Sequence, residues 1–562
     1  MNNTLLPPNT LALQSLYHWE KTAGQRVCLT QPMAGGEVQV FTWAEALNET
    51  RRMAAHLQSL ALAPGSRIAI LSKNTAHWLM ADWAIWMAGF VSVPLYPTLA
   101  AGTVRQILDH SEAQLLFVGK LDDWESMKAG VPEGLACISL PLAPPNPYPT
   151  WSSVIAGVAP LAGEPVRGGD ELCTLMYTSG TTGNPKGVMH SFDNFARAIT
   201  EGLARIPMDA NYRILSYLPL SHIAERVMVE HALLATGMQL FFAESLDTFA
   251  QDLRRARPTF FFSVPRLWVK FKEGVDAKIP PAKLARMLKI PIVRGLVRKK
   301  VLTTLGLDQC RFAAGGAAPM PADLLRWYTA LGLDIVEIYG MTENCGVSHT
   351  TLPGKSRPGT VGLNFPGVQC RLAPADSEIQ MKSNMLMLGY FKEPQLSQES
   401  LTADGWLRTG DKGAMDAEGN LKITGRVKDL FKTNKGKYVA PAPIEDKLAL
   451  TPGVEACCVV GSNLGQPLAL LMLSMLAAKQ ALDGAHRASL EAGIATKLAE
   501  VNATLDPHEQ LSCMVVISEA WTVESGLITP TFKVKRNRIE EVYGPSFEAW
   551  TAQRKKVLWH AA

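Results

Sequence analysis

The sequence has few of the features that mark secreted, metal-binding or nucleic-acid-binding proteins. Its nine cysteines are scattered, odd in number and without a CxxC pair, so neither a disulfide framework nor a zinc site is expected. The net charge of +4 over 562 residues is too small for a dedicated nucleic-acid-binding protein. The N-terminal segment lacks the basic start and apolar core of a signal peptide. These absences predict a cytoplasmic protein with reduced thiols.

Long hydrophobic runs are also scarce, and residues 76–97 are the stretch to test as a membrane span. Asp82 lies within it, and a charged side chain is costly at the centre of a bilayer. Gly89 and Pro94 interrupt the run as well. We therefore expect a buried helix that runs into a strand, while peripheral membrane contact and a homodimer stay open.

The length of the chain exceeds what one hydrophobic core holds, because single cores stop growing near roughly 250–300 residues. Two or three domains are expected. A helix over residues 41–60 opens with Thr42 and Glu45 in capping-box spacing. Strand-like runs then alternate with helices, which predicts βαβ units and a parallel sheet. These runs are residues 67–71, 91–95, 114–118, 212–217, 238–242, 259–263 and 334–339.

The pattern changes twice towards the C-terminus. Residues 359–425 have short strands with Gly and Pro turns, which indicates a small β-rich subdomain. Residues 430–562 read as a separate α+β domain, with strands at 456–460, 469–473 and 513–517 and a helix at 488–503. The predicted class is thus α/β, with a large N-terminal domain (1–425) of parallel-rich sheets and a small C-terminal domain. Residues 280–300, basic and interrupted by prolines, are predicted to be a surface excursion.

The segment from Thr178 to Gly187 has the chemistry of an anion-binding loop. It contains three glycines, four hydroxyl residues and Lys186. Glycines let the backbone approach an anion closely, hydroxyls donate to phosphate oxygens, and the lysine adds a positive charge. The preceding residues 172–177 are strand-like, so the loop lies at the C-terminal end of a strand, where ligands of open α/β sheets bind.

A Walker A loop, G-x-x-x-x-G-K-[ST], is the first alternative for such a loop. Counted from Gly180, its second glycine would fall where Pro185 stands, directly before Lys186. Gly187 follows the lysine where the motif needs Ser or Thr. The spacing excludes a Walker A loop, and composition alone leaves a surface loop rich in Ser, Thr and Gly as the remaining alternative.

Residues 177–188, YTSGTTGNPKGV, resemble the phosphate-loop signature of the adenylate-forming superfamily, which includes acyl-CoA synthetases, luciferases and peptide-synthetase adenylation domains. The resemblance covers about residues 13–536. It implies an enzyme that uses ATP to convert a carboxylic acid to an acyl-adenylate and pyrophosphate. Its further motifs follow in order: LPLSH at 218–222, GGAAP at 315–319, YGMTE at 339–343, RTGD at 408–411 and GR at 425–426.

The resemblance implies a role at the phosphates for two groups of residues. Glu343 would bring Mg²⁺ to the phosphates, which suits a hard cation that prefers oxygen ligands, and a surface ion pair is its alternative role. Thr342 would donate to the α-phosphate. The cradle for the β- and γ-phosphates would consist of Thr178, Ser179, Gly180, Thr181, Thr182, Gly183 and Lys186.

For the nucleoside, the resemblance implies that the ring of Tyr339 stacks on adenine, although a core tyrosine is an alternative. Asp411 would accept both ribose hydroxyls, and Arg426 would support the ribose and phosphate. The base would also face the backbone of Gly316, Ala317 and Ala318.

One lysine of the C-terminal domain is implied to bridge the substrate carboxylate and the α-phosphate. The matching residues 527–536 contain Lys533 and Lys535, and we choose Lys533. Thr531 and Phe532 stand where the common form of the motif has Ser-Gly, as they tend to do in long-chain acyl-CoA synthetases.

The resemblance also implies that the C-terminal domain is mobile and swings after adenylation, so that one site serves both half-reactions. Residues 426–429 would form the hinge, with Lys428 at its centre. Gly436 would then let the pantetheine arm of CoA pass close to the backbone. Lys435 and Lys437 would either contact CoA phosphates or remain solvated.

Several phrases resemble the long-chain fatty acyl-CoA synthetase branch, among them residues 217–226, 263–268 and 436–441. The acid is therefore expected to be a medium- or long-chain fatty acid, with CoA as acceptor. His222 would line the acyl entrance, or would be a satisfied core histidine. Trp268, with the aromatic cluster before it, would line an acyl tunnel, or would belong to a buried strand and its next turn.

Two rival functions stay open. One is an acyl-AMP ligase or aryl-acid ligase of the same superfamily with another acceptor. The other is a catalytically silent nucleotide-binding scaffold. The joint presence of Lys186, Glu343, Asp411 and Lys533 argues against the scaffold, because a lapsed site would be expected to lose some of them.

Overall fold

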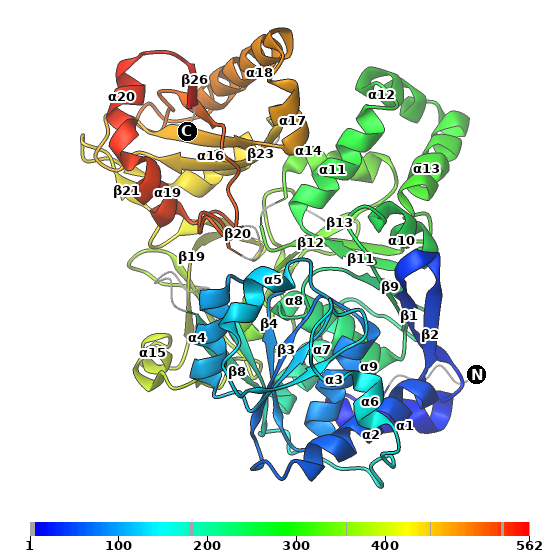
Figure 1. Cartoon of the computed structure of the whole chain (residues 1–562). Coiled ribbons are helices and arrows are strands. Elements are labelled where there is room, and N and C mark those ends of the chain that lie inside the picture. The colour runs from blue at the N-terminus through cyan, green and yellow to red at the C-terminus, as the bar shows by residue number, and fades with distance from the viewer. Residues whose placement is uncertain are drawn as a thin grey trace.

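The computed structural model describes residues 6–178, 185–318, 320–355, 357–449, 451–529 and 533–560. Figure 1 shows a large body that carries the N-terminal elements and a smaller body above it that carries the C-terminal elements, drawn from yellow to red. Helices and strands alternate in both bodies, so the predicted α/β class with a small α+β C-terminal domain is confirmed.

A seven-stranded sheet, in the order β18-β8-β7-β4-β3-β5-β6, forms the first layer of the large body. Its strands β3 to β7 are parallel, whereas β8 returns antiparallel to β7 as a hairpin and β18 pairs antiparallel with β8. The bounds are β3 Arg67–Leu71, β4 Val91–Leu95, β5 Leu115–Val118, β6 Ala136–Ser139, β7 Leu172–Thr178, β8 Lys186–Ser191 and β18 Gly389–Tyr390.

Two helices cover opposite faces of this sheet because alternate side chains of a strand point to opposite faces. Ile68 and Ile70 pack with α3 (Ala76–Met87), and Ala69 and Leu71 pack with α4 (Ala101–Ser111). Every residue of α3 is buried, and β4 follows it, as the sequence predicts for residues 76–97. Among the described helices, none is long and apolar enough to cross a membrane.

Two further sheets complete the large body. The first has the order β11-β12-β13-β14-β15, with β11 to β13 parallel, and the second has the order β2-β1-β10-β9. The helix α2 (Trp43–Ser59) begins with the predicted capping box between Thr42 and Glu45. The strand bounds are β11 Phe260–Ser263, β12 Phe312–Gly316, β13 Ile335–Tyr339, β14 His349–Thr350, β15 Leu363–Asn364, β1 Val27–Pro32, β2 Val38–Thr42, β9 Arg213–Ser216 and β10 Gln239–Phe242.

The region predicted to be β-rich contains an antiparallel sheet of four strands. Its order is β16-β17-β19-β20, and a turn at residues 427–429 follows it. The bounds are β16 Gln369–Leu372, β17 Glu378–Lys382, β19 Leu407–Met415 and β20 Leu421–Arg426.

The C-terminal body is a four-stranded sheet in the order β23-β24-β25-β26 with helices on both faces. The helices α16 (Pro441–Leu448) and α18 (Gly484–Asn502) pack on one face, and α19 (Arg536–Tyr543) and α20 (Phe547–Ala552) on the other. A short hairpin, β21 (Phe431–Lys432) and β22 (Tyr438–Val439), precedes the sheet. The strand bounds are β23 Val454–Val460, β24 Leu468–Leu473, β25 Met514–Ile517 and β26 Val557–His560.

The basic segment at residues 280–300 is mostly exposed, as predicted, and its prolines begin helices. It forms two helices, α12 (Pro281–Lys289) and α13 (Pro291–Leu305), and each begins with a proline. The reason is that the first helical position needs no backbone N–H donor and suits the fixed φ of proline.

Candidate active site

The β7–β8 hairpin positions the two described ends of the predicted phosphate loop. Thr178 and Lys186 are register partners at the end of the hairpin where β7 passes into β8. The other predicted cradle residues lie outside the described residues: Ser179, Gly180, Thr181, Thr182 and Gly183.

Tyr390 connects Lys186 to Glu343. Its hydroxyl donates to Oε1 of Glu343 at 2.8 Å, and Nζ of Lys186 lies 5.7 Å from the centroid of its ring. Burial and the Glu343 carboxylate both raise the pKa of Tyr390, which keeps its hydroxyl a donor. The pairing of β18 with β8 brings Tyr390 to this place. No sequence motif reveals Tyr390, because the pairing of β18 with β8 joins segments about two hundred residues apart.

The short 3₁₀-helix Thr342–Asn344 carries Thr342 and Glu343. His190 contacts it and fixes its position. Nε2 of His190 donates to the Thr342 carbonyl at 2.7 Å, and Nδ1 lies 3.4 Å from Sγ of Cys345. Burial lowers the pKa of His190 to about 4, so the imidazole is neutral at neutral pH and uses both nitrogens. His190 thereby fixes the motif loop to the strand that follows the phosphate loop.

Three of the residues predicted for the nucleoside, Tyr339, Asp411 and Arg426, form a connected group. The hydroxyl of Tyr339 donates to Oδ2 of Asp411 at 2.7 Å, and Nε of Arg426 lies 3.1 Å from Oδ1 of the same carboxylate. Asp411 and Arg426 are register partners on β19 and β20, which explains their ion pair. Tyr339 is at the end of β13. An aromatic ring, a carboxylate and a guanidinium thus meet, as recognition of a nucleoside phosphate requires.

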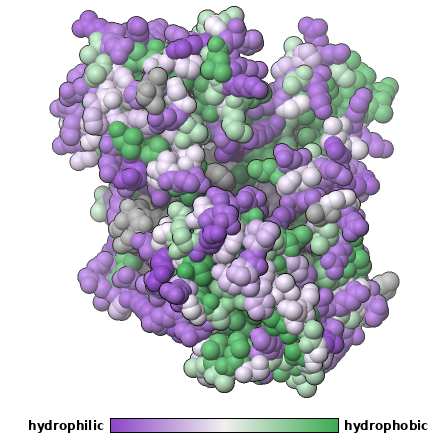
Figure 2. Space-filling view, in the orientation of Figure 1, coloured by the Kyte–Doolittle hydropathy of each residue, from purple (hydrophilic) through white to green (hydrophobic). Residues whose placement is uncertain are grey.

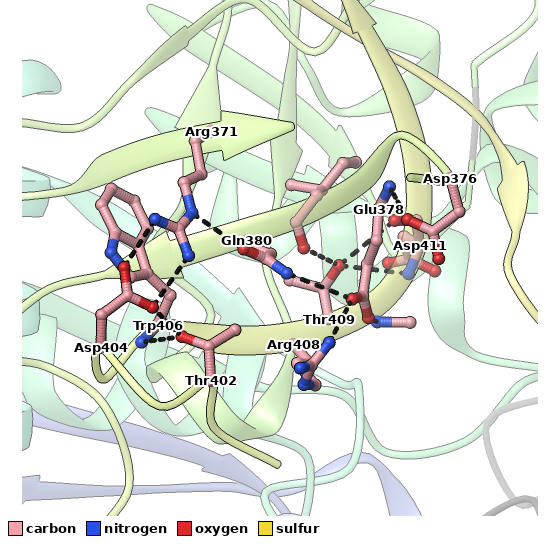
Figure 3. Close-up of polar contacts among 12 residues, drawn as sticks. Arg371, Asp376, Glu378, Gln380, Thr402, Asp404, Trp406, Arg408, Thr409 and Asp411 are labelled. Carbon is pink, nitrogen blue, oxygen red and sulfur yellow. Dashed lines mark hydrogen bonds and ion pairs between the residues drawn. The ribbon is translucent and has the colours of Figure 1, made fainter. Parts of the chain in front are cut away.

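A buried carboxylate supports the turn that presents Asp411 (Figure 3). Oε1 of Glu378 accepts the backbone N–H of Gly410 at 3.0 Å, and Oγ1 of Thr409 accepts the N–H of Asp411 at 3.1 Å. Glu378 itself contacts Gln380 and Arg408. Its role could not be read from the motif, because Glu378 lies on the neighbouring strand β17, more than thirty residues before Asp411 in the sequence.

The predicted adenine-binding turn follows β12. A Cβ on Gly316 would lie 2.7 Å from the Ile338 carbonyl, so only glycine fits against the neighbouring strand. Ala317 has a φ of +66°, which is unusual for a residue with a side chain and marks a constrained turn. Both Ala317 and Ala318 are exposed, so this edge of the backbone is open to a ligand.

Lys533 of the C-terminal body reaches this site. Burial and the charge of Arg426 lower its pKa, while Asp411 and Glu343 act in the opposite direction. Burial lowers the pKa of His222 to about 4, and the positive charge of Lys533 acts in the same direction. The backbone N–H of Lys533 donates to Oγ1 of Thr529 at 3.0 Å.

His222 begins the helix α8 (Ile223–Glu225), where its Nδ1 accepts the backbone N–H of Ala224 at 3.2 Å. An apolar cavity begins beside it. The cavity lies between α7 (Phe192–Arg205), the π-helix η3 (Arg226–His231) and β13. Its lining is almost wholly apolar: Ala198, Ile199, Gly202, Ile206, Met208, Ala224, Val227, Met228, Phe260, Ile338, Cys345, Gly346, Val347 and Phe365.

Trp268 does not line this cavity. It is fully buried on α11 (Pro265–Asp276), with its Nε1 donating to the Ala314 carbonyl at 3.3 Å and its ring against Phe261 and Tyr328. The structure therefore places Trp268 in the core, the alternative that the sequence left open.

The predicted hinge residue Lys428 and the predicted CoA residue Gly436 lie in exposed loops. Lys428 is exposed in the turn after β20. Gly436, with a φ of +76°, is exposed in the hairpin loop between β21 and β22, as are Lys435 and Lys437. In this arrangement of the two bodies, the charges of Arg426, Asp411 and Glu343 act on Lys533.

The site offers few side-chain ligands for a metal ion. The described residues contain no group of three or more His, Cys, Asp or Glu side chains that could hold one. Glu343 offers a single carboxylate. That fits Mg²⁺, which is commonly held by one or two carboxylates together with substrate phosphates, and does not fit zinc.

Two family models match the chain. The one described as AMP-binding enzyme matches residues 16–391, and the one described as AMP-binding enzyme C-terminal domain matches residues 428–554.

Similar proteins span nearly the whole chain. The long-chain-fatty-acid–CoA ligase FadD15 of Mycobacterium bovis is 31% identical over 554 residues, covering 90% of this chain and 92% of that protein. The peroxisomal long chain acyl-CoA synthetase 7 of Arabidopsis thaliana is 28% identical, covering 92% and 82%. The crystal structure of the adenylation domain of a carboxylate reductase from Mycobacterium chelonae superposes with a TM-score of 0.80 at 22% identity, covering 97% and 92%. That crystal structure shares the fold of this chain.

Proposed function

The chain belongs to the AMP-binding enzyme family and is an acid–thiol ligase that uses ATP and CoA, and we propose that its acid is a long-chain fatty acid. The observation that carries the proposal is that Lys533 lies near enough to the Arg426–Asp411 ion pair and to Glu343 for their charges to shift its pKa. Groups suited to a ribose, a phosphate and a carboxylate converge there from both bodies. The two sequence relatives reported above are both named for long-chain acyl substrates.

In the first half-reaction, a carboxylate oxygen attacks the α-phosphorus, the bond to the β-phosphate oxygen breaks, and pyrophosphate leaves. Asp411 would hold the ribose hydroxyls and Tyr339 the base. Lys533 would place its ammonium between the carboxylate and the α-phosphate, which offsets their repulsion and the charge that develops on the phosphoryl oxygens. Thr342 would donate to the same phosphate. Lys186 would meet the departing pyrophosphate.

Mg²⁺ would be held by Glu343 and the phosphates of ATP, and it would supply charge neutralisation there. Tyr390 occupies one oxygen of Glu343 and leaves the other available. The hydrogen bond would fix the direction in which that free oxygen points.

The first part of the acyl chain would enter past His222 into the apolar cavity between α7, η3 and β13, whose volume of about 50 Å³ is too small for the whole of a long chain. Three connections support this placement. Ala224 lines the cavity two residues after His222, Ile338 lines it directly before Tyr339, and Cys345 lines it two residues after Glu343. A neutral imidazole at the entrance suits an apolar chain better than a charged one, and burial keeps His222 neutral.

In the second half-reaction, the CoA thiolate attacks the acyl carbonyl carbon, a thioester forms, and AMP leaves with the electron pair. Lys533 is not needed for this step. A turn of the C-terminal body about Lys428 would remove it and bring the loop of Gly436 to the site. Glycine there would let the pantetheine arm pass close to the backbone.

The test is a screen of short-, medium- and long-chain fatty acids and aryl acids for CoA-dependent AMP release. We expect the highest kcat/KM with long-chain fatty acids. A preference for aryl acids, or pyrophosphate release with fatty acids but no thioester with CoA, would favour the rival ligases. Absence of acid-dependent ATP–pyrophosphate exchange with every acid would leave a nucleotide-binding scaffold.

A further inference from the structure

We infer that the hairpin of α12 and α13 is a docking surface for an anionic lipid bilayer. The inference goes beyond the proposed reaction and does not rest on it. The hairpin stands out from the large body at the upper right of Figure 1, on the far side from α4 and α15 (Pro394–Glu399). It carries an apolar tip and a set of unpaired positive charges.

A small core of its own holds the hairpin in place. Leu284 of α12 packs with Val297 and Val301 of α13 and, beneath them, with Val275 of α11 and Leu331. Nε of Arg298 donates to the Ala330 carbonyl at 2.9 Å and ties α13 to the body. The hairpin is thus an anchored element, and the side chains on its outer side are not needed for its packing.

The tip of the hairpin exposes large aliphatic side chains. Ile290 in the connection is 52% exposed, and Ile292 and Leu296 of α13 are 82% and 69% exposed. Ile292 and Leu296 are four residues apart, so they lie on the same face of the helix. Figure 2 shows hydrophobic surface at the upper right, over α13. Three neighbouring aliphatic side chains in water favour burial against an apolar partner.

Positive charge surrounds this tip. Residues 277–301 contain eight Lys or Arg and no Asp or Glu, although the whole chain has a net charge of only +4. Within the described part of the chain, no carboxylate pairs with the side chains of the seven that are exposed. These are Lys278, Lys283, Arg286, Lys289, Arg294, Lys299 and Lys300. Long basic side chains beside an apolar tip can reach lipid phosphates while the tip enters the acyl boundary.

A bilayer fits this surface better than a nucleic acid does. Single-stranded nucleic acids bound without sequence preference stack their bases on aromatic rings, and residues 277–301 contain no aromatic residue. Phosphates alone would leave Ile290, Ile292 and Leu296 exposed. An anionic bilayer offers both a negative surface and a hydrocarbon layer, so it satisfies both kinds of side chain.

The test is flotation of the purified protein with vesicles, without acid, ATP or CoA. We expect binding to vesicles that contain phosphatidylglycerol, weaker binding at high salt, and little binding to phosphatidylcholine alone. Because no turnover is involved, the result is independent of the proposed reaction. Equal binding to both kinds of vesicle, or none to either, would overturn the inference. So would retention of duplex DNA by a protein that does not bind vesicles.

Two variants with matched controls locate the surface. The triple variant Lys283→Ala, Arg286→Ala, Lys289→Ala should bind the anionic vesicles roughly tenfold less tightly or worse. Its control removes three exposed lysines of the C-terminal body, with Lys479→Ala, Lys555→Ala and Lys556→Ala, and should bind as the unmodified protein does.

The apolar tip is tested by Ile292→Ser with Leu296→Ser, which should weaken binding even at low salt. Its control, Met475→Ser with Leu482→Ser, alters side chains that are each 87% exposed on and beside α17 (Met475–Gln480). Urea unfolding midpoints show whether each variant is folded. Equal loss of vesicle binding in a hairpin variant and its control would contradict the assignment to this hairpin.

Discussion

At the scale of single residues, removal of the Tyr390 hydroxyl tests whether its hydrogen bond positions the Glu343 carboxylate for Mg²⁺. We expect Tyr390→Phe to raise the Mg²⁺ concentration needed for half-maximal activity by about tenfold, because a hydrogen bond to a charged group is lost. The fold should be unchanged. Titration of activity with Mg²⁺ measures the effect. Tyr212→Phe is the control, since Tyr212 also lies beside a cation, Arg311, but directly precedes β9 and belongs to no part of the candidate site. Equal effects of the two variants would show that Tyr390 does not act through Glu343.

A second prediction concerns His349, which is buried beside Tyr339. Burial lowers its pKa to about 4, whereas an unfolded histidine titrates near 6.5. Between these values only the unfolded state gains the proton, so the contribution to stability is complete above about pH 6.5 and falls as the pH is lowered towards 4. The wild type should lose up to about 3 kcal/mol over this window relative to His349→Gln. Urea unfolding at several pH values measures the difference.

The residues of the site differ in how readily a sequence reveals them. Asp411 and Tyr339 stand in short contiguous motifs, so a reader of the sequence can locate them. Tyr390, Glu378 and His190 could not be located this way. Each acts on a motif residue from a strand or loop that only the tertiary fold brings near.

At the scale of elements, a buried ion cluster supports the wall of the apolar cavity. Nη1 of Arg226 on η3 lies 2.8 Å from Asp82 on α3 and 3.2 Å from Glu230, and all three side chains are fully buried. Burial raises the pKa of both carboxyls. Val227 and Met228, on the same π-helix, line the cavity. The cluster thus holds the helix that shapes the acyl site.

Arg226→Met should lower the free energy of unfolding by about 3 kcal/mol, because it leaves two buried carboxyls without a cation. Tryptophan fluorescence during urea unfolding can report it, since the rings of Trp78 and Trp86 lie 5.2 and 5.5 Å from the guanidinium. Arg105→Met breaks an exposed ion pair with Asp109 and should cost less than about 1 kcal/mol. A loss for Arg226→Met no greater than that of the control would contradict a structural role for the cluster.

Most elements were predictable because their hydrophobic pattern is local. The strands β3 and β4 match the predicted ranges, and most others shift by a residue or two. The π-helix η3 was not predictable, since its form depends on the buried charges and the cavity beside it. The prolines of α12 and α13 were misleading for another reason, because a proline starts a helix as well as it ends one.

At the scale of the whole molecule, the arrangement of the two bodies follows from contacts that no motif encodes. Arg266 of α11 forms an ion pair with Glu455 of β23, and Lys533 reaches the nucleoside site. Which of the two arrangements the chain takes could not be predicted, because both would use the same residues of the N-terminal body.

Lys428→Pro tests the hinge. The backbone N–H of Lys428 donates no hydrogen bond within the described part of the chain, so the substitution removes rotation without removing a contact. ATP–pyrophosphate exchange should persist, while thioester formation should fall by at least about tenfold. Lys428→Ala should retain both. Unchanged turnover with CoA in Lys428→Pro would remove Lys428 from the hinge.

In this mechanism Lys533 acts in the adenylation step and not in the thioester step. Its ammonium meets the charges of the nucleoside site in this arrangement and would leave it before the thioester forms. Lys535, which begins α19, is the matched control.

The most direct measurement is therefore to follow the two half-reactions of Lys533→Ala separately. Fatty-acid-dependent ATP–pyrophosphate exchange should fall by roughly 100- to 1000-fold. Thioester formation from supplied acyl-adenylate and CoA should stay near that of the wild type, and Lys535→Ala should retain both. Equal loss of the two half-reactions in Lys533→Ala, or full exchange activity, would contradict the account.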